Sequence, residues 1–192
     1  MWAFLTPDSL MIWNILEGET IRGLIIMIIG LPATGKSTIA KNITSELKGT
    51  LLRTDLIRKQ LLKKPRYSKK EKDLIYGVML SVTNYLTSLG ETVILDGTFY
   101  KRSTREKVYR MANENQINLR IVECCCPVEV IKRRMNRRKR NKYPLSQADY
   151  ETYKKISAQF DAIRREHIIV DTSNFLRSSI TEVIYKLRKD MD

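Results

Sequence analysis

Apolar positions follow two different periods along the chain, and their alternation predicts the order of strands and helices. Short, nearly continuous apolar runs, typical of buried strands, occupy residues 24–29, 50–54, 92–96, 119–125 and 167–171. After the first run, Ile39, Ile43 and Leu47 recur at the spacing of one helical face. Strands that are regularly separated by helices predict an α/β fold, with a parallel sheet covered by helices on both faces.

The segments between the other apolar runs have helical patterns and start or stop signals. We expect helices at 55–62, 71–89, 103–115, 127–140, 146–160 and 175–189. Ser103 with Glu106, and Ser146 with Asp149, have the spacing of a capping box and predict two helix starts. Pro127 at a first helical position predicts another start, and Gly90 predicts the end of the helix at 71–89. The buried face of that helix is predicted to contain Leu74, Ile75, Val78, Val82, Tyr85, Leu86 and Leu89.

The sequence GLPATGKST, residues 30–38, stands between the first strand and the first helix and fits G-x-x-x-x-G-K-[ST], the P-loop pattern. Its glycines let successive backbone N–H groups point at phosphate oxygens, Lys36 brings a charge to the β- and γ-phosphates, and the Ser37 hydroxyl is placed to bind Mg²⁺. The positive end of the following helix acts at the same place. We therefore predict ATP and Mg²⁺ as cofactors, with ATP contacts from Gly30, Ala33, Thr34, Gly35, Lys36, Ser37 and Thr38.

Polar residues stand where the second and third strands end, which is the edge at which open parallel sheets bind ligands. Asp55 follows the second strand, with Arg58 one helical turn later, and Asp96 closes the third strand before Thr98. One carboxylate here can accept the proton of an acceptor hydroxyl, and another can order Mg²⁺ or its waters. The alternative role of Asp55 is helix capping, and that of Asp96 is a turn.

The helix at 127–140 is strongly basic, and the block KRRMNRRKRNK covers residues 132–142. Arg134 and Arg138 are four residues apart and share a helical face. Two guanidinium groups on one face can hold the donor phosphates and stabilise the charge that develops during transfer. We predict a basic helical lid at about residues 132–150, with a solvent-facing role for the arginines as the alternative.

Charge and length narrow the class of protein. The 192 residues suffice for one domain with a full core, and the formal net charge is +14. Such an excess of Lys and Arg favours a polyanionic partner, most simply nucleic acid, over a solvated basic face. No apolar run is long enough to cross a membrane, and adjacent cysteines at 124–126 suit a reducing cytoplasm. Residues 1–23 are predicted to form an apolar N-terminal extension.

The order of P-loop, Asp-x-x-Arg, strand-ending Asp and Arg-x-x-x-Arg resembles the P-loop polynucleotide 5′-hydroxyl kinases, over roughly residues 24–187. The resemblance implies a kinase domain at residues 24–192 in which Asp55 is the general base and Lys36 acts on the donor phosphates. It implies that Arg58 contacts the phosphate beside the acceptor hydroxyl and that Arg134 and Arg138 are lid arginines. Asp96 and Thr98 then belong to the acceptor side, and Ser37 and Asp96 to the metal. The sequence departs from the phage-type enzyme after Asp96, where Gly-Thr-Phe replaces a Thr-Asn pair.

Three acceptor classes are compatible with these motifs. The first is the 5′-hydroxyl of RNA or DNA, which Asp55-x-x-Arg58 and the net charge favour. The second is a hydroxyl carried on tRNA, as in seryl-tRNA kinases. The third is a small metabolite, as in adenylylsulfate kinases or the zeta-toxin group. A non-catalytic nucleotide-binding module is disfavoured because it needs neither an acidic residue on the acceptor side nor paired lid arginines.

Overall fold

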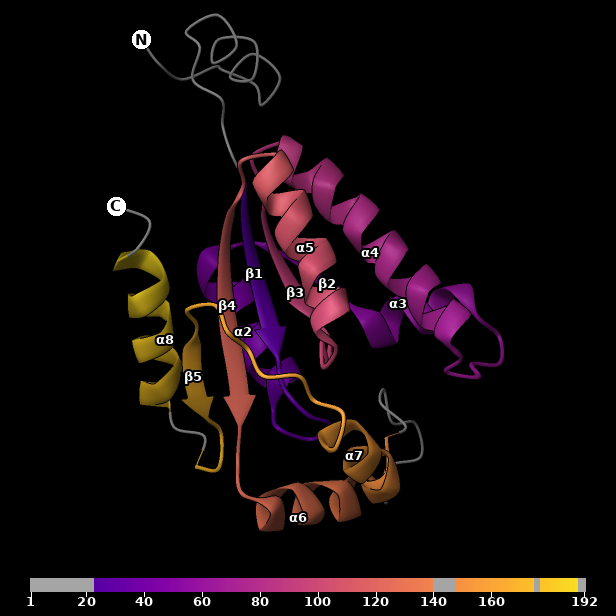
Figure 1. Ribbon diagram of the computed structural model, residues 1–192. Helices are drawn as coiled ribbons and strands as arrows, with labels where there is room; N and C mark the ends of the chain where they lie inside the picture. Colours follow the sequence, from indigo (N-terminus) through magenta and orange to yellow (C-terminus); the bar gives the residue numbers. More distant parts are fainter. Residues whose placement is uncertain (1–22, 140–147, 175–176, 190–192) are drawn as a thin grey trace, which may run out of the picture.

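A computed structural model describes residues 23–139, 148–174 and 177–189 and shows a five-stranded, wholly parallel sheet at the centre of the fold (Figure 1). The strands are β1 (Leu24–Ile29), β2 (Thr50–Arg53), β3 (Thr92–Asp96), β4 (Asn118–Cys125) and β5 (Ile168–Asp171). Their order across the sheet is β2-β3-β1-β4-β5, so the chain crosses over between neighbours as βαβ units require. The predicted fold class is confirmed, and each predicted strand is present within one residue of its expected start.

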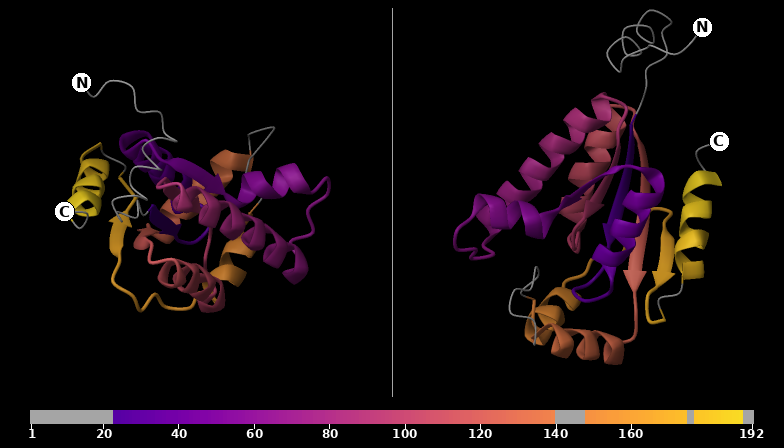
Figure 2. Two further views of the ribbon diagram at one scale, coloured as in Figure 1. Left: turned by 90° about the horizontal axis from the view of Figure 1, so that it is seen from above. Right: turned by 180° about the vertical axis from the view of Figure 1, so that it is seen from behind.

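Helices cover both faces of this sheet, as the alternating pattern predicts (Figures 1 and 2). Helices α2 (Lys36–Leu47) and α8 (Arg177–Lys189) pack on one face in a core that includes Ile39, Ile43 and Leu187. Helices α4 (Lys69–Ser88) and α5 (Arg102–Glu114) cover the other face, with Met79 and Val108 in the core. Every residue of β1 is buried because this central strand is covered on both sides.

Three further helices lie at the carboxyl ends of the strands, where the arrowheads point in Figure 1. They are α3 (Thr54–Leu61), α6 (Val128–Lys139) and α7 (Tyr150–Ser157). A small separate core of Ala33, Ile131, Met135 and Tyr153 joins the P-loop to α6 and α7. The predicted lid at about 132–150 therefore includes most of α6 and the start of α7, while residues 140–147 lie outside the described ranges.

Two predicted helix starts need correction. Helix α5 begins at Arg102 and its N-cap residue is Lys101, with no side-chain capping bond, so the Ser103–Glu106 capping box is wrong. Helix α7 begins at Tyr150, and the Asp149 side chain accepts a hydrogen bond from the Thr152 N–H at 2.8 Å. Asp149 is thus the N-cap residue itself and not the third residue of a helix that starts at Ser146, which lies outside the described residues.

The predicted buried face of α4 is also wrong for four of its seven residues, although Ile75 is buried and Leu86 packs against the core. The side chains that α4 buries are Ile75, Met79, Thr83 and Thr87, whereas Leu74, Val82, Tyr85 and Leu89 are exposed. Burial of two threonines is possible because their hydroxyls donate to helix carbonyls: Thr83 to Met79 O at 2.7 Å, and Thr87 to Thr83 O at 2.8 Å. Helix α4 therefore has two apolar faces, of which the less obvious one meets the sheet.

Within the described ranges, no helix combines the length and the apolar content that crossing a membrane requires.

Candidate active site

A cavity of about 540 Å³ opens at the carboxyl ends of the central strands. Its walls come from the P-loop, the start of α3, the N-terminal half of α4, the loop after β3, and α6 and α7. This is the edge at which a parallel sheet of this kind binds ligands, because loops from neighbouring strands meet there. The cavity brings together residues that are more than 100 positions apart in the chain.

Backbone geometry explains both motif glycines of the P-loop. Gly30 has φ +148°, and a Cβ there would lie 2.4 Å from the carbonyl oxygen of Cys124 in β4. Gly35 has φ +89°, and a Cβ there would lie 3.1 Å from Thr172 Oγ1. A side chain is excluded at Gly30 by conformation and by space, whereas at Gly35 the positive φ disfavours one and Thr172 leaves little room. The loop can therefore curl tightly before α2 begins at Lys36.

Lys36 points its ammonium group into the loop and donates to the Leu31 carbonyl oxygen at 2.7 Å. Burial lowers the pKa of Lys36, and the nearby Asp96 carboxylate opposes that shift. The ammonium group is therefore poorly solvated and held in place at the mouth of the loop. A phosphate in the cavity would give the ammonium group an anionic partner in place of the water that solvates an exposed lysine.

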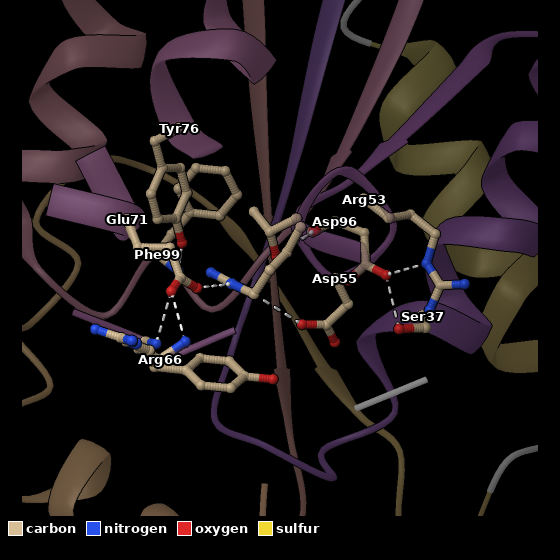
Figure 3. A network of polar contacts seen from close by, with 11 residues as sticks. Ser37, Arg53, Asp55, Arg66, Glu71, Tyr76, Asp96 and Phe99 are labelled. Atoms are coloured by element: carbon tan, nitrogen blue, oxygen red, sulfur yellow. Dashed lines mark hydrogen bonds and ion pairs between the residues drawn. The ribbon is translucent and has the colours of Figure 1, made fainter. Parts of the chain in front are cut away.

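Asp96 at the end of β3 is the centre of a buried polar cluster (Figure 3). Its Oδ2 accepts hydrogen bonds from Ser37 Oγ at 2.7 Å and from Arg53 Nε at 3.0 Å. The Arg53 and Asp96 side chains are 8% and 6% exposed, so their ion pair is well shielded from water. A hydroxyl and a carboxylate side by side at a P-loop are oxygen donors of the kind that Mg²⁺ takes from a protein when substrate phosphates complete its coordination. The predicted metal residues Ser37 and Asp96 thus fit the ion.

Asp55, which Figure 3 shows near Asp96 and Ser37, forms a second polar cluster with Arg58 on α3, and both residues line the cavity. Arg58 Nη1 lies 3.3 Å from Asp55 Oδ1, and Arg58 Nε lies 2.9 Å from Glu71 Oε1. Burial raises the pKa of Asp55, while the Arg58 guanidinium acts in the opposite direction. The raised pKa moves this carboxylate towards the range in which a general base works well near neutral pH.

Glu71 at the start of α4 holds this cluster in place. Its Oε2 accepts hydrogen bonds from the backbone N–H groups of Arg66 at 2.7 Å and Tyr67 at 2.9 Å. Burial alone would raise the pKa of Glu71, but these bonds and the Arg58 guanidinium lower it overall. The Tyr67 ring covers Arg58, with 4.7 Å between the guanidinium carbon and the ring centroid. Arg58 is thus clamped between two carboxylates and a ring, and only 6% of it is exposed.

The structure places the two arginines of the predicted lid differently. Arg138 lines the cavity, and burial lowers its pKa, whereas the Asp55 carboxylate opposes that shift. Arg134 is not among the lining residues: its guanidinium donates to Ala33 O at 3.2 Å, to Thr172 Oγ1 at 3.0 Å and to Thr172 O. Arg134 therefore joins α6 to the back of the P-loop and to the turn after β5.

Most of the sequence-predicted residues meet in this one cavity, including Ala33, Gly35, Lys36, Ser37, Asp55, Arg58, Asp96, Thr98 and Arg138. Four others do not line it. Gly30 lies beneath the loop and donates from its N–H to Thr98 O at 3.5 Å, and Thr34 is buried with its hydroxyl bonded to Leu31 O. Thr38 is exposed on α2, and Arg134 is bonded as described above.

Sequence reasoning missed several residues of the cavity and its supports, namely Arg53, Tyr67, Glu71, Lys72, Tyr76, Tyr100 and Lys155. Arg53 had a usable signal because it closes β2, at the ligand-binding edge of the sheet. Glu71, Lys72 and Tyr76 had none, because they belong to α4 and reach the cavity only through the packing of that helix on α3 and β3.

A scan against protein families matches residues 25–163 to the AAA domain family. Curated proteins that are similar in sequence include an uncharacterised protein of Mycobacterium tuberculosis (strain ATCC 25618 / H37Rv), which is 27% identical over 128 residues. That alignment includes 60% of this chain and 25% of the relative, so the chain spans about a quarter of the length of the curated relatives it matches.

Solved structures with a similar fold include P-loop kinases. The adenylylsulfate (APS) kinase CysC of Mycobacterium tuberculosis, in complex with AMPPNP and APS, superposes with a TM-score of 0.70 at 19% identity. That match covers 87% of this chain and 98% of the kinase chain. A chain of the Pnkp1/Rnl/Hen1 RNA repair complex matches with a TM-score of 0.59 at 19% identity, over 72% of this chain and 44% of that one. At these identities the matches establish the fold, which is that of the P-loop kinases.

Proposed function

Since the chain belongs to the AAA domain family and has the P-loop kinase fold, we propose that it is an ATP-dependent kinase that phosphorylates the 5′-hydroxyl of a polynucleotide. The observation that carries this proposal is the placement of Asp55 and Lys36 in one cavity. Asp55 is a candidate base with a raised pKa, and Lys36 is the P-loop lysine. The two residues flank the space in which a donor phosphate and an acceptor hydroxyl would meet.

On the donor side, the P-loop residues hold the triphosphate of ATP. Backbone N–H groups of the loop and the positive end of α2 bind the β- and γ-phosphates, together with the Lys36 ammonium group. Ser37 and Asp96 would hold Mg²⁺, which when bound neutralises charge on the phosphate oxygens. Arg138 lines the same cavity and supplies a guanidinium for charge that develops on the transferred phosphoryl group.

On the acceptor side, Asp55 takes the proton of the hydroxyl as the oxygen attacks the γ-phosphorus. The new P–O bond forms as the bond to the β-phosphate oxygen breaks, so ADP leaves and a 5′-phosphate remains on the acceptor. Arg58 and Glu71 keep the Asp55 carboxylate in position. The resemblance to polynucleotide kinases gives Arg58 a contact with the neighbouring phosphate, and that role stays a prediction because its Nε and Nη1 are bonded to carboxylates.

The chemistry of the cavity wall supports a polynucleotide acceptor. Lys72 and Lys155 line the cavity together with Tyr67 and Tyr100. The Lys72 ammonium group lies 3.4 Å from Tyr100 Oη, and no ion pair ties it to a described carboxylate. An ammonium group over a partly exposed ring, as Lys72 lies over Tyr100 at 5.7 Å from the ring centroid, suits a strand that presents phosphates and bases in turn. The net charge of +14 and the fold likeness to a chain of an RNA repair complex favour the same acceptor.

A small-metabolite acceptor is the second candidate, and one observation favours it. The APS kinase structure, which holds the small acceptor APS, superposes over more of this chain than the RNA repair protein does. A hydroxyl carried on tRNA is the remaining candidate, since it would use the same basic surface. The three cysteines are free, in accord with the reducing cytoplasm that the sequence suggests.

One experiment separates these acceptors. The protein is incubated with Mg²⁺ and ATP labelled in the γ-phosphate, in parallel with 5′-hydroxyl RNA, 5′-hydroxyl DNA, tRNA, APS and other small alcohols. Label transfer to the RNA or DNA end, lost in Lys36→Ala, supports the proposal. Activity on two nucleosides, one with and one without a 3′-phosphate, then shows whether the protein recognises the neighbouring phosphate. Transfer to a small alcohol alone, or equal activity on both nucleosides, contradicts the polynucleotide acceptor.

A further inference from the structure

A second cavity, of about 200 Å³, lies between the N-terminal half of α5 and the segment that connects α7 to β5. Guanidinium groups dominate its lining: Arg102 and Arg105 come from α5, and Arg164 and Arg165 come from the connecting segment. Among the described residues that line it, Glu106 alone is acidic. Four cations against one anion favour a negatively charged ligand.

Arg105 is buried beside this cavity without a carboxylate partner among the described residues. It is 1% exposed, and its Nη1 donates to the carbonyl oxygens of Phe99 at 2.9 Å and Tyr100 at 3.3 Å. Its Nη2 donates to the carbonyl oxygens of Asp161 and Ala162, both at 2.8 Å. These bonds satisfy the Nη donors but do not neutralise the charge, so an anion in the cavity would be stabilised.

The remaining arginines can contact a ligand directly. Arg164 and Arg165 are exposed, and no described carboxylate forms an ion pair with either. The Arg165 guanidinium carbon lies 4.2 Å from the ring centroid of the buried Tyr109, which fixes the plane of that group. Planar guanidinium groups suit the oxygens of a phosphate, to which they can donate in pairs.

The two acids at this cavity are already bonded. Glu106 Oε1 accepts from Arg102 Nε at 3.2 Å, in a pair whose side chains are 58% and 44% exposed on the Arg102 and Glu106 sides. Asp161 Oδ2 accepts from the Arg102 backbone N–H at 2.7 Å. Neither carboxylate pairs with Arg164 or Arg165, so these two guanidinium groups keep their charge for a ligand.

The second cavity adjoins the active-site cavity. Tyr100 lines the first cavity and Arg102 the second, and in the other wall Gln159 lines the first and Ala162 the second. Because an extended chain spans at most about 3.6 Å per residue, the Cα atoms of these pairs lie within about 7 Å and 11 Å of each other. The Asp161 N–H donates to Tyr100 O at 2.9 Å and ties the two segments together.

Positive charge continues from one cavity to the other. The ammonium groups of Lys72 and Lys101 lie 5.7 Å and 5.6 Å from the centroid of the Tyr100 ring. Lys72 lines the first cavity, and Lys101 directly precedes Arg102 of the second. Cations and a ring in alternation form a surface that a single nucleic-acid strand fits.

We propose that Arg102, Arg164 and Arg165 bind a backbone phosphate of the acceptor strand, on the 3′ side of the nucleotide whose hydroxyl meets Asp55. This inference rests on the proposed function, since it takes the occupant of the first cavity to be a polynucleotide. Arg105 contributes its charge, because its Nη donors are already bonded. The second site sets a minimum length for tight binding, which a single nucleoside or a small alcohol does not reach.

The dependence of binding on acceptor length tests this proposal. Affinities of 5′-hydroxyl oligonucleotides of one to about eight nucleotides are measured without ATP, by competition with a fluorescently labelled strand. Wild-type affinity should rise in a step at the length that reaches the second cavity. Arg164→Ala/Arg165→Ala should remove the step and weaken long acceptors by about tenfold, the effect of a lost hydrogen bond to a charged group, while the shortest acceptor binds as before. The salt slope should decrease by about one unit for long acceptors only.

The matched control is Arg110→Ala, since Arg110 is exposed on α5 and lines neither cavity. This variant should keep the full step. Arg164→Glu leaves the contact between Arg165 and Tyr109 in place, so it provides the answer if the double variant fails to fold, which circular dichroism checks. Identical length curves in the wild type, Arg164→Glu and Arg110→Ala overturn the proposal.

Two further outcomes separate the ligand and the function. Calorimetric titration with inorganic phosphate that shows binding through Arg164 and Arg165, without a length step for strands, assigns the cavity to a free anion and overturns the strand site. An arginine-dependent length step in a protein that transfers no phosphate to the strand supports the second site and contradicts only the kinase function. Transfer to 5′-hydroxyl ends with a KM that depends neither on length nor on these arginines supports the kinase and overturns the second site.

Discussion

Ser37 donates from its hydroxyl to Asp96 at 2.7 Å, so the P-loop is tied to the end of β3 across 59 positions of the chain. The same carboxylate forms a buried ion pair with Arg53. Asp96 thus bonds to two residues at once: Ser37, which belongs to the donor site, and Arg53, which closes β2. Its removal should affect stability and turnover through different partners.

Asp96→Ala should lower the free energy of unfolding by about 3–5 kcal/mol, because it leaves the Arg53 guanidinium buried without a counter-ion. Denaturant titration measures this loss. The control is Lys107→Ala, which breaks the exposed Lys107–Asp73 pair and should change stability by about 0.5 kcal/mol or less. Equal losses of unfolding free energy in the two variants would show that the buried Arg53–Asp96 pair stabilises the fold no more than an exposed pair does.

Lys36→Met should abolish phosphate transfer and keep or raise the melting temperature at neutral pH. Burial lowers the pKa of Lys36, so the charged form is less favourable in the folded protein than in the unfolded chain. The neutral side chain removes that penalty, together with the charge that binds the donor phosphates. Activity assays and thermal melts on the same sample check the loss of phosphate transfer and the melting temperature. A folded Lys36→Met protein with normal transfer would falsify the donor-site assignment.

Asp55→Asn should reduce turnover by about 10²- to 10⁴-fold, the range for a positioned general base, with ATP affinity little changed. The raised pKa of Asp55 also fixes the direction of a stability effect. A carboxyl whose pKa is raised on folding stabilises the protein below its unfolded pKa, and that contribution is lost as pH rises through the folded pKa. Asp55→Asn should therefore melt higher than wild type at neutral pH, with the gain vanishing in acid.

For wild-type activity, the raised pKa of Asp55 predicts that the acidic limb of the pH–rate profile lies above the pH expected for an ordinary Asp. The limb should be absent in Asp55→Asn. A limb at the same pH in both proteins would assign the titration to another group.

The two arginines of the predicted lid should affect different properties, one turnover and the other stability. Arg138→Ala, which removes a cavity side chain, should lower turnover by about 10- to 10³-fold with little change in stability. Arg134→Ala should instead lower the free energy of unfolding by about 1–3 kcal/mol, since Ala33 O and the Thr172 backbone lose their donor. Arg137→Ala, at an exposed position of the same helix, is the control for both measurements. Full activity of Arg138→Ala at saturating ATP would remove Arg138 from the proposed mechanism.

Lys72→Ala should weaken polynucleotide binding and leave ATP binding unchanged, because Lys72 lines the part of the cavity in which we propose that the acceptor binds. The slope of binding against salt concentration should decrease by about one unit if the ammonium group contacts a phosphate. Lys69→Ala, on an exposed residue of the first turn of α4 that does not line the cavity, is the matched control. An unchanged salt slope in Lys72→Ala would place the phosphate contact elsewhere.

The parts of this protein that sequence alone determined are those whose signals are local. The strand runs, the glycines of the P-loop and the polar residues at strand ends depend on backbone conformation and on side-chain period, so they can be found in a single segment. These signals predict a parallel sheet with a site at its carboxyl edge, and the structure confirms the sheet. The placement of Lys36, Ser37, Asp55 and Asp96 around one cavity follows from the same rule.

Tertiary packing decided the rest, because it depends on which of several possible faces meets a neighbour. Helix α4 has two apolar faces, and only contact with the sheet selects Ile75 and Met79 over the Leu74–Tyr85 side. That choice also turns Glu71 towards Arg58, which no local pattern indicates. Arg134 and Arg138 share a helical face, yet the P-loop and Thr172 bind Arg134 and leave Arg138 to the cavity. Such selections arise from shape and hydrogen bonding between segments distant in the chain, where periodicity carries no information.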